Sequence, residues 1–129
     1  MQNRAGILFL SINSGRVFLI WENKWTVPTF IRNRGVIEDA QELLSSYNLT
    51  DAKFVPIELY TSKDSGFEYS TYVVLVEDDF ACPTGTYSWS NLDNLPKNVH
   101  IGLKNTLSNK ITQVKIETIL ATGKSYDID

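Results

Sequence analysis

The sequence predicts one α+β domain in which a mixed β-sheet lies between helices, and three observations support this architecture. Two apolar, β-prone runs flank a turn near the N-terminus, at Gly6–Ile12 and Val17–Trp21. A helical repeat of apolar residues begins at Val36, and two more β-prone runs follow it. A second helical repeat begins at Val99. The order hairpin, helix, hairpin, helix is typical of an α/β/α sandwich on a mixed sheet.

The first hairpin joins its two runs through Asn13–Arg16, which supplies turn-forming residues. Both runs are apolar almost throughout, so we expect the strands to be covered on both faces.

A second pair of strands is predicted at Lys53–Tyr60 and Phe67–Val76, joined by a turn at Ser62–Gly66. Tyr87–Trp89 favours one further short strand.

The first helix is predicted over residues 36–47, where negative charge in the first turn, at Glu38 and Asp39, suits the helix dipole. Asn48 is a plausible left-handed terminator. The apolar residues at helical spacing are Val36, Ile37, Ala40, Leu43, Leu44 and Tyr47.

The second helix is marked by apolar residues at helical spacing from Val99 onward, at Leu103, Leu107 and Ile111. Its end is left open, because the stretch 111–120 also fits a strand.

Composition restricts the class of protein. The 129 residues form a single predicted domain over 1–129 with a polar tail at about 123–129, and 43% hydrophobic content is ordinary for a globular protein. A net charge of −3 argues against broad nucleic-acid binding. The single cysteine, Cys82, excludes an internal disulfide and fits a reducing compartment. No apolar run is long enough to span a membrane, and no signal peptide is apparent, so we expect a cytoplasmic protein.

The segment Val27–Leu49 resembles the Nudix box, a loop–helix–loop in which members of the Nudix (MutT-like) superfamily hold Mg²⁺ and a nucleoside diphosphate. Three other segments are similar to the family in order and spacing: Ala5–Phe9, Trp25–Pro28 and Ser88–Pro96. Together these segments span most of the chain. The resemblance implies a Nudix-like α/β/α sandwich with a mixed β-sheet.

The box departs from the family pattern at the residues that carry the chemistry. Ser45 and Ser46 stand where the family has its metal-binding pair of glutamates, and Val36 replaces another glutamate. The helix is about one turn shorter than in the family. Of the family's catalytic acids, only Glu42 remains.

Glutamates at positions i, i+3 and i+4 project from one helical face and can converge on Mg²⁺. Here Glu42, Ser45 and Ser46 occupy that face, and neutral hydroxyls are poor ligands for a hard cation. We therefore expect no standard Nudix hydrolysis and no required cofactor. Mg²⁺ would be needed only in a divergent hydrolase that uses Glu42 with acids from elsewhere.

Those other acids could come from the run Glu77–Asp79, from Glu58 and Glu68 in strands, or from Glu38 and Asp39. Consecutive carboxylates on a loop are usually solvated charge, so this relocated metal site stays a minority interpretation.

The remaining candidate ligand-binding residues lie around the box. Arg32 and Arg34 precede the helix and, with nearby Lys24, could clamp a phosphate without metal, although a solvated surface loop is the simpler interpretation. Trp25 is the best candidate for an exposed aromatic that stacks on a base, against ordinary packing. Phe30 stands where the family needs glycine, and its ring could block the phosphate path.

His100, the only histidine, is expected to cap or pack at the start of the second helix rather than to act in catalysis.

Three functions follow from these observations. The first is a non-hydrolytic Nudix-fold protein that binds a nucleotide or another phosphorylated ligand. The second is a divergent hydrolase of nucleoside diphosphates linked to another moiety. The third is an interaction module that binds a protein partner. We favour binding or interaction over catalysis, and the sequence fixes neither the ligand nor an oligomeric state.

Overall fold

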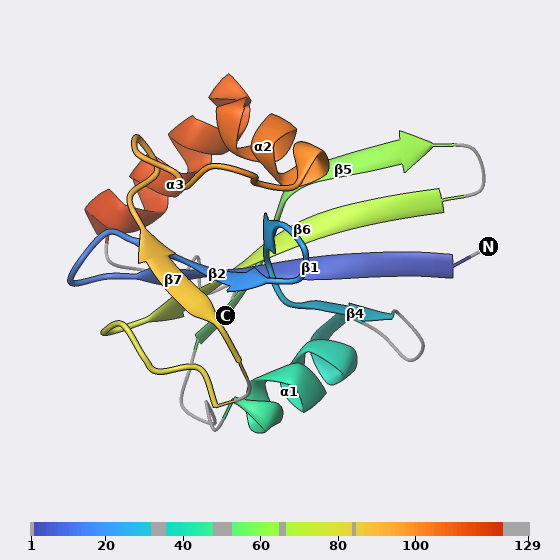
Figure 1. The fold of residues 1–129 in the computed structure, drawn as a ribbon, viewed down its shortest axis with the longest axis horizontal. Helices are drawn as coiled ribbons and strands as arrows, with labels where there is room; N and C mark the ends of the chain where they lie inside the picture. Colours follow the sequence, from blue (N-terminus) through green and yellow to red (C-terminus); the bar gives the residue numbers. More distant parts are fainter. Residues whose placement is uncertain (1, 32–35, 48–52, 65–66, 84, 123–129) are drawn as a thin grey trace.

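The computed structural model describes residues 2–31, 36–47, 53–64, 67–83 and 85–122. A mixed sheet separates two helical layers, with α1 on one face and α2 and α3 on the other (Figure 1). The elements in chain order are β1 (Gln2–Ser11), β2 (Val17–Trp21), β3 (Trp25–Thr26), β4 (Thr29–Ile31), α1 (Val36–Ser46), β5 (Lys53–Asp64), β6 (Phe67–Val76), β7 (Tyr87–Ser90), α2 (Ile101–Ser108) and α3 (Lys110–Thr122). The predicted α/β/α sandwich is confirmed.

The strands of the sheet follow the order β3-β2-β1-β6-β5, while β4 pairs with β1 and β7 pairs with β2. β1 and β6 are parallel in unbroken register from Gln2↔Phe67 to Ser11↔Val76. The other strand pairs are antiparallel. The sheet is therefore mixed, as predicted, and β1 lies at its centre.

The first predicted hairpin is present, with Leu10 opposite Val17. Its turn places Gly15 at φ 70°, a left-handed conformation that glycine adopts without steric cost, and the amide of Gly15 donates to the carbonyl of Ser11 over 2.9 Å. The second hairpin is also present, but β5 continues to Asp64, so residues 62–64 are strand rather than turn. Residues 65–66 lie outside the described part.

The core consists of two clusters, because successive residues of β1 point to opposite faces of the sheet. Leu8 and Leu10 belong to the cluster beneath α2 and α3, and Ile7 and Phe9 belong to the cluster beneath α1. All four residues have no exposed surface. This confirms that the apolar strands are covered on both faces.

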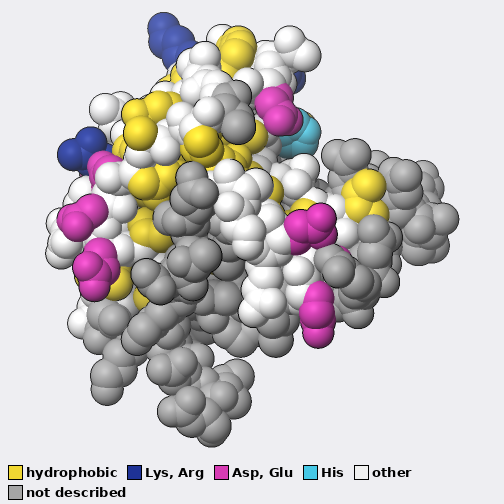
Figure 2. All heavy atoms as spheres, turned by 90° about the horizontal axis from the view of Figure 1, so that it is seen from below, with side chains coloured by type: hydrophobic (Ala, Val, Ile, Leu, Met, Phe, Trp, Pro, Cys, Tyr) yellow, Lys and Arg dark blue, Asp and Glu magenta, His cyan; other side chains and the backbone are white. Residues whose placement is uncertain are grey.

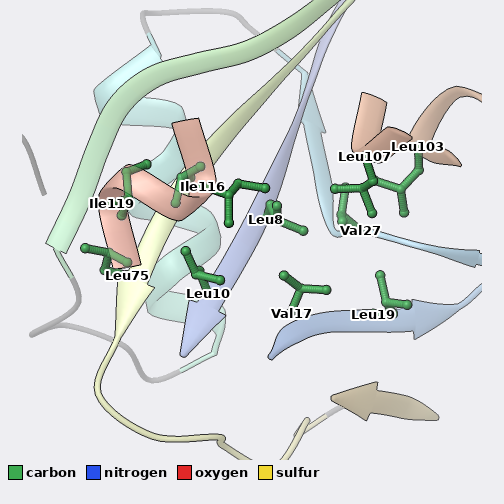
Figure 3. Close-up of a cluster of buried hydrophobic side chains, with 11 residues drawn as sticks. Leu8, Leu10, Val17, Leu19, Val27, Leu75, Leu103, Leu107, Ile116 and Ile119 are labelled. Atoms are coloured by element: carbon green, nitrogen blue, oxygen red, sulfur yellow. The ribbon is translucent and has the colours of Figure 1, made fainter. Parts of the chain in front are cut away.

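The cluster on the α2 and α3 side is drawn in Figure 3, where side chains of the sheet meet those of the two helices. Its members are Leu8, Leu10, Val17, Leu19, Val27, Val73, Leu75, Leu103, Leu107, Ile116 and Ile119. A compact apolar cluster of this kind supplies the main favourable term in folding.

The helical stretch that begins near His100 is two helices rather than one, and residues 111–120 are helical rather than extended. Asn109 causes the break, because its side-chain oxygen accepts from the amides of Ile111, over 2.9 Å, and Thr112, over 3.4 Å. Asparagine is a preferred N-cap for this reason. His100 begins α2 as its N-cap, accepting through Nδ1 from the amide of Gly102 over 3.1 Å, so the capping prediction is confirmed.

Candidate functional site

The outer face of α1 carries Glu42, Ser45 and Ser46, and all three side chains are exposed. The hydroxyl of Ser46 donates to the carbonyl of Leu43 over 2.6 Å, one turn back along its own helix. A hydroxyl bound to its own helix in this way is a common arrangement for serine. At the positions where the resemblance puts two glutamates, this face therefore offers two exposed serines, and the hydroxyl of Ser46 is engaged with the backbone.

The inner face of α1 packs against the sheet. Leu43 and Tyr47 lie against the apolar cluster on this side, and Phe30 of β4 packs against the same cluster. Phe30 is half-buried and pairs with Ala5 across the β1–β4 ladder. Its ring thus belongs to the packing beneath α1.

The acidic run after β6 fastens the first hairpin. Asn13 donates to Asp78 over 2.7 Å, the hydroxyl of Ser14 donates to Asp79, and Arg16 forms an ion pair with Asp79 at 3.6 Å. All members of the run Glu77–Asp79 are exposed. Because the carboxylates of Asp78 and Asp79 already hold the turn, solvated structural charge is the interpretation that the contacts favour.

Within the part of the chain that the structure describes, no group of three or more His, Cys, Asp and Glu side chains is arranged to hold a metal ion. Glu58 and Glu68 lie in β5 and β6, but their side chains lie outside what the structure describes.

Trp25 lies on the other side of the sheet from Phe30, and Lys24 precedes it in the turn. The exposed Lys24 follows Asn23, which has a left-handed φ of 64°, in the turn between β2 and β3. Trp25 packs against the cluster beneath α2 and α3, and its backbone carbonyl accepts from the amide of His100 over 2.8 Å.

The expectation that Trp25 is the exposed aromatic needs correction. Trp25 is half-buried, whereas its neighbour Trp21 is 42% exposed, with the two ring centroids 5.3 Å apart. Trp25 packs inward because its strand lies over the apolar cluster. The predicted ligand residues Trp25 and Phe30 are thus on opposite faces, and Arg32 and Arg34 lie outside the described residues.

A group of aromatic side chains that the sequence did not single out lies between α1 and β7. Phe18 is at its centre, with ring centroids 4.7 Å from Phe80, 5.3 Å from Trp89 and 5.9 Å from Tyr47. The indole of Trp89 donates to the carbonyl of Phe80 over 2.8 Å. The rings come from segments far apart in the sequence, so no local pattern could have revealed the group.

Burial raises the pKa of Tyr47 from 10.0 to about 12, with smaller contributions from the nearby Cys82 and Glu22. The phenol therefore stays protonated and neutral at neutral pH.

Figure 2 views the molecule from the α1 side, where hydrophobic side chains gather in one part of the surface, with acidic side chains and Lys or Arg side chains beside them. No helix in the described ranges is long and apolar enough to cross a membrane.

Comparison with protein-family models finds no match to the sequence, and no curated protein matches it either. Solved structures do match the fold. A MutT Nudix hydrolase from Burkholderia pseudomallei is 18% identical with a TM-score of 0.55, and the match covers 85% of this chain and 99% of that chain.

Two further structures are similar over nearly their whole length. An Ap4A hydrolase from C. elegans, in a binary complex, is 14% identical with a TM-score of 0.63, and the match covers 92% of this chain and 98% of that chain. An ADP-ribose pyrophosphatase from Streptococcus suis is 13% identical with a TM-score of 0.60, covering 99% of this chain and 96% of that chain. Because these matches extend over most of both chains, the chain has the Nudix fold.

Proposed function

We propose that this chain is a Nudix-fold binding protein that has lost metal-dependent hydrolysis. The single observation that carries the proposal is the outer face of α1, where Ser45 and Ser46 stand in place of a glutamate pair and the Ser46 hydroxyl is bound to the carbonyl of Leu43. Mg²⁺ prefers anionic oxygen ligands in octahedral geometry, and one carboxylate seldom holds it without substrate phosphates. Glu42 alone supplies too little negative charge for this role.

Loss of the ion would remove two contributions to hydrolysis. A bound metal lowers the pKa of the attacking water and neutralises charge on the phosphates. Ser45 and Ser46 replace neither effect, because serine hydroxyls are neutral. Binding without turnover is the function that such a surface supports.

The first class of ligand is a nucleotide or another phosphorylated small molecule. Arg32 and Arg34 immediately precede α1 in the sequence, and guanidinium groups beside a helix N-terminus suit phosphate oxygens. The names of two structural neighbours, an Ap4A hydrolase and an ADP-ribose pyrophosphatase, agree with a nucleotide ligand by analogy of fold. Trp25 and Phe30 pack on opposite faces of the sheet and do not form one site, so in this proposal the arginines hold the phosphate.

The second class of ligand is a protein partner, and a specific observation favours it. The surface on the α1 side exposes hydrophobic side chains next to acidic ones (Figure 2). Exposed apolar surface rimmed by polar groups is typical of protein interaction sites.

A divergent hydrolase is the alternative, in which Glu42 acts with relocated acids. A panel of nucleoside diphosphate derivatives, incubated with Mg²⁺ or Mn²⁺, separates the two functions. We expect no turnover. Turnover that Glu42→Gln abolishes, and that the exposed control Glu117→Gln retains, would overturn the proposal.

The binding function is tested by thermal unfolding with the same panel in the absence of metal. A ligand that binds only the folded state raises Tm in proportion to the logarithm of its concentration. We expect Arg32→Ala with Arg34→Ala to remove a nucleotide-dependent shift, and Lys104→Ala on α2 to retain it. A shift that survives the arginine substitutions places the phosphate elsewhere.

A further inference from the structure

We infer that a second copy of this chain pairs with the outer edge of β7, so that two sheets join across a two-fold axis at Ser88. Among the described strands β7 pairs with β2 alone, so within that part of the chain its other edge is unpaired (Figure 1). A free strand edge presents amides and carbonyls that can pair with a strand of another chain. A dimer of this kind goes beyond the proposed function, since it requires neither the serines of α1 nor the arginines before it.

The ladder between β2 and β7 shows which backbone groups face outward. Trp21 lies opposite Thr86, one step beyond the end of the β2–β7 register. The amide of Trp21 donates to the carbonyl of Thr86 over 3.1 Å, so the two residues form a hydrogen-bonded pair. Such pairs alternate with non-hydrogen-bonded pairs along an antiparallel ladder. The amides and carbonyls of Tyr87 and Trp89 therefore face away from β2.

These outward groups are available for pairing. Within the described part of the chain, the backbone groups of Tyr87 and Trp89 make no hydrogen bond, although the Trp89 indole donates to the carbonyl of Phe80. Gly85 and Thr86 are exposed just before them, and Tyr87 is 39% exposed. Donors and acceptors at alternate positions are what an added strand requires.

The other margin of the sheet, at β5, carries features that protect an edge. Its sequence contains Pro56 and Lys63, and its register with β6 is irregular on both sides of Glu58. Proline, lysine and bulges are devices by which natural sheets avoid association. β7 has none of these, and its register with β2 is unbroken. Its short length limits the number of bonds, so we expect a weak dimer.

The spacing of the outward residues selects a second copy as the occupant. When two β7 strands run antiparallel about an axis at Ser88, Tyr87 of one copy lies opposite Trp89 of the other, and the two-fold axis repeats this pair. Both members of each pair have outward backbone groups, so each pair exchanges two hydrogen bonds. The edge is thus complementary to itself in this register.

The same axis brings aromatic rings together. The rings of Tyr87 and Trp89 lie 5.8 and 5.3 Å from that of Phe18, so both side chains are on the α1 side of the sheet. Residues directly opposite in an antiparallel pair share a face, and aromatic pairs across strands are favourable. The core and the bond from the Trp89 indole already hold these rings, so association costs them little freedom.

A disulfide at Ser88 tests the register. Ser88 would face its own copy in a non-hydrogen-bonded pair, where Cα atoms are about 4.5 Å apart, a separation that a disulfide can span. In a Cys82→Ser background, we expect Ser88→Cys to form a covalent dimer with oxidised glutathione, measured by non-reducing electrophoresis. The control is Ser108→Cys, at an exposed position on α2, which should stay monomeric.

Sedimentation equilibrium measures the association without a crosslink. We expect the natural chain to show a reversible monomer–dimer equilibrium. Tyr87→Thr keeps a strand-forming residue but removes the ring, and it should weaken the dimer roughly fivefold. The matched control is Ile111→Thr, which removes apolar surface at a residue of α3 that is 66% exposed and should leave the equilibrium within about twofold.

Any of three results would overturn the inference. The first is a natural chain that stays monomeric up to about 1 mM, which would leave the edge to a strand of a different protein. The second is Ser88→Cys that crosslinks no more than Ser108→Cys, and the third is a dimer that Tyr87→Thr weakens no more than Ile111→Thr. The last two would place the contact between copies elsewhere. Neither hydrolysis nor nucleotide binding enters these measurements, so the proposed function is tested separately.

Discussion

The hydroxyl of Ser46 donates a hydrogen bond to the backbone carbonyl of Leu43 over 2.6 Å, on the exposed face of α1. The resemblance to the Nudix box assigns a metal-binding glutamate to this position. In the proposed function, a hydroxyl that turns back to its own helix in place of a carboxylate leaves this face without its metal ligands.

Restoring the carboxylates should restore metal binding. The double variant Ser45→Glu with Ser46→Glu places acids at i+3 and i+4 from Glu42, and such a face can converge on one cation. We expect Mn²⁺ to raise the Tm of this variant by a few degrees, measured by differential scanning calorimetry, with no saturable effect on the natural sequence.

A third substitution serves as the control for this experiment. Adding Glu42→Gln to the double variant should reduce the Mn²⁺ effect, since it removes the first carboxylate of the set. A saturable Mn²⁺ effect on the natural sequence that Glu42→Gln removes would contradict this prediction and would support the relocated metal site.

The bond between Trp89 and Phe80 fixes the loop after β6 to β7. Trp89→Phe removes the indole donor, which reaches the carbonyl of Phe80 at 2.8 Å, and keeps an aromatic ring in the cluster. We expect a loss of about 1–2 kcal/mol in the free energy of unfolding, measured by urea denaturation, because a half-buried carbonyl loses its partner. Trp21→Phe, at a ring that is 42% exposed, should cost about 0.5 kcal/mol or less.

Local pattern was enough to predict much of the fold. Val17–Trp21 and Phe67–Val76 were predicted with the bounds that β2 and β6 have, because both are continuous apolar runs. β3 and β4 were missed because two or three residues show no periodicity, and they become strands only by pairing with β2 and β1. Asn109 is a sequence signal for the break between α2 and α3, since an asparagine at that point caps α3.

The candidate site depends more strongly on tertiary contacts. The serine replacement at positions 45 and 46 is readable in sequence, and the structure places both side chains on an exposed helical face. Trp25 and Phe30 lie on opposite faces of the sheet. Their positions depend on two short strands, because β3, which carries Trp25, pairs with β2, and β4, which carries Phe30, pairs with β1. The parallel pairing of β1 with β6 joins segments about 65 residues apart, which sequence periodicity cannot indicate.

Stability at high pH should depend on Tyr47. Its pKa is raised from 10.0 to about 12 by burial first, so the folded state holds the phenol proton more tightly than the unfolded state. The corresponding stabilisation is fully present below pH 10 and is lost as the pH rises toward 12. After allowance for the partial exposure of the ring, the loss amounts to about 2 kcal/mol.

The variant Tyr47→Phe cannot ionise and should show none of this loss. Urea denaturation across the alkaline range gives the difference in unfolding free energy between variant and natural protein. We expect that difference to be constant below about pH 9 and to shift in favour of the variant above it. A constant difference up to about pH 11 would show that the phenol ionises as readily in the folded protein as in the unfolded chain.

The N-cap of α2 should contribute measurably to stability. His100→Ala removes the acceptor for the amide of Gly102, which lies 3.1 Å from Nδ1. We expect a loss of about 1 kcal/mol in thermal or urea unfolding, and His100→Asn should recover most of it, because asparagine also caps helices. Equal losses in both variants would assign the effect to packing of the imidazole instead.

Two buried threonines predict opposite responses to the same substitution. The hydroxyl of Thr71 is fully buried and has no hydrogen-bond partner among the described residues, whereas that of Thr106, on a residue 1% exposed, donates to the carbonyl of Gly102 over 2.9 Å. Valine has nearly the shape of threonine but lacks the hydroxyl. Thr71→Val removes an unsatisfied polar group and should stabilise the fold by about 1 kcal/mol. Thr106→Val removes a satisfied one and should destabilise it by a similar amount. If urea denaturation shows both variants to be destabilised alike, the Thr71 hydroxyl has a partner, such as a bound water, in solution.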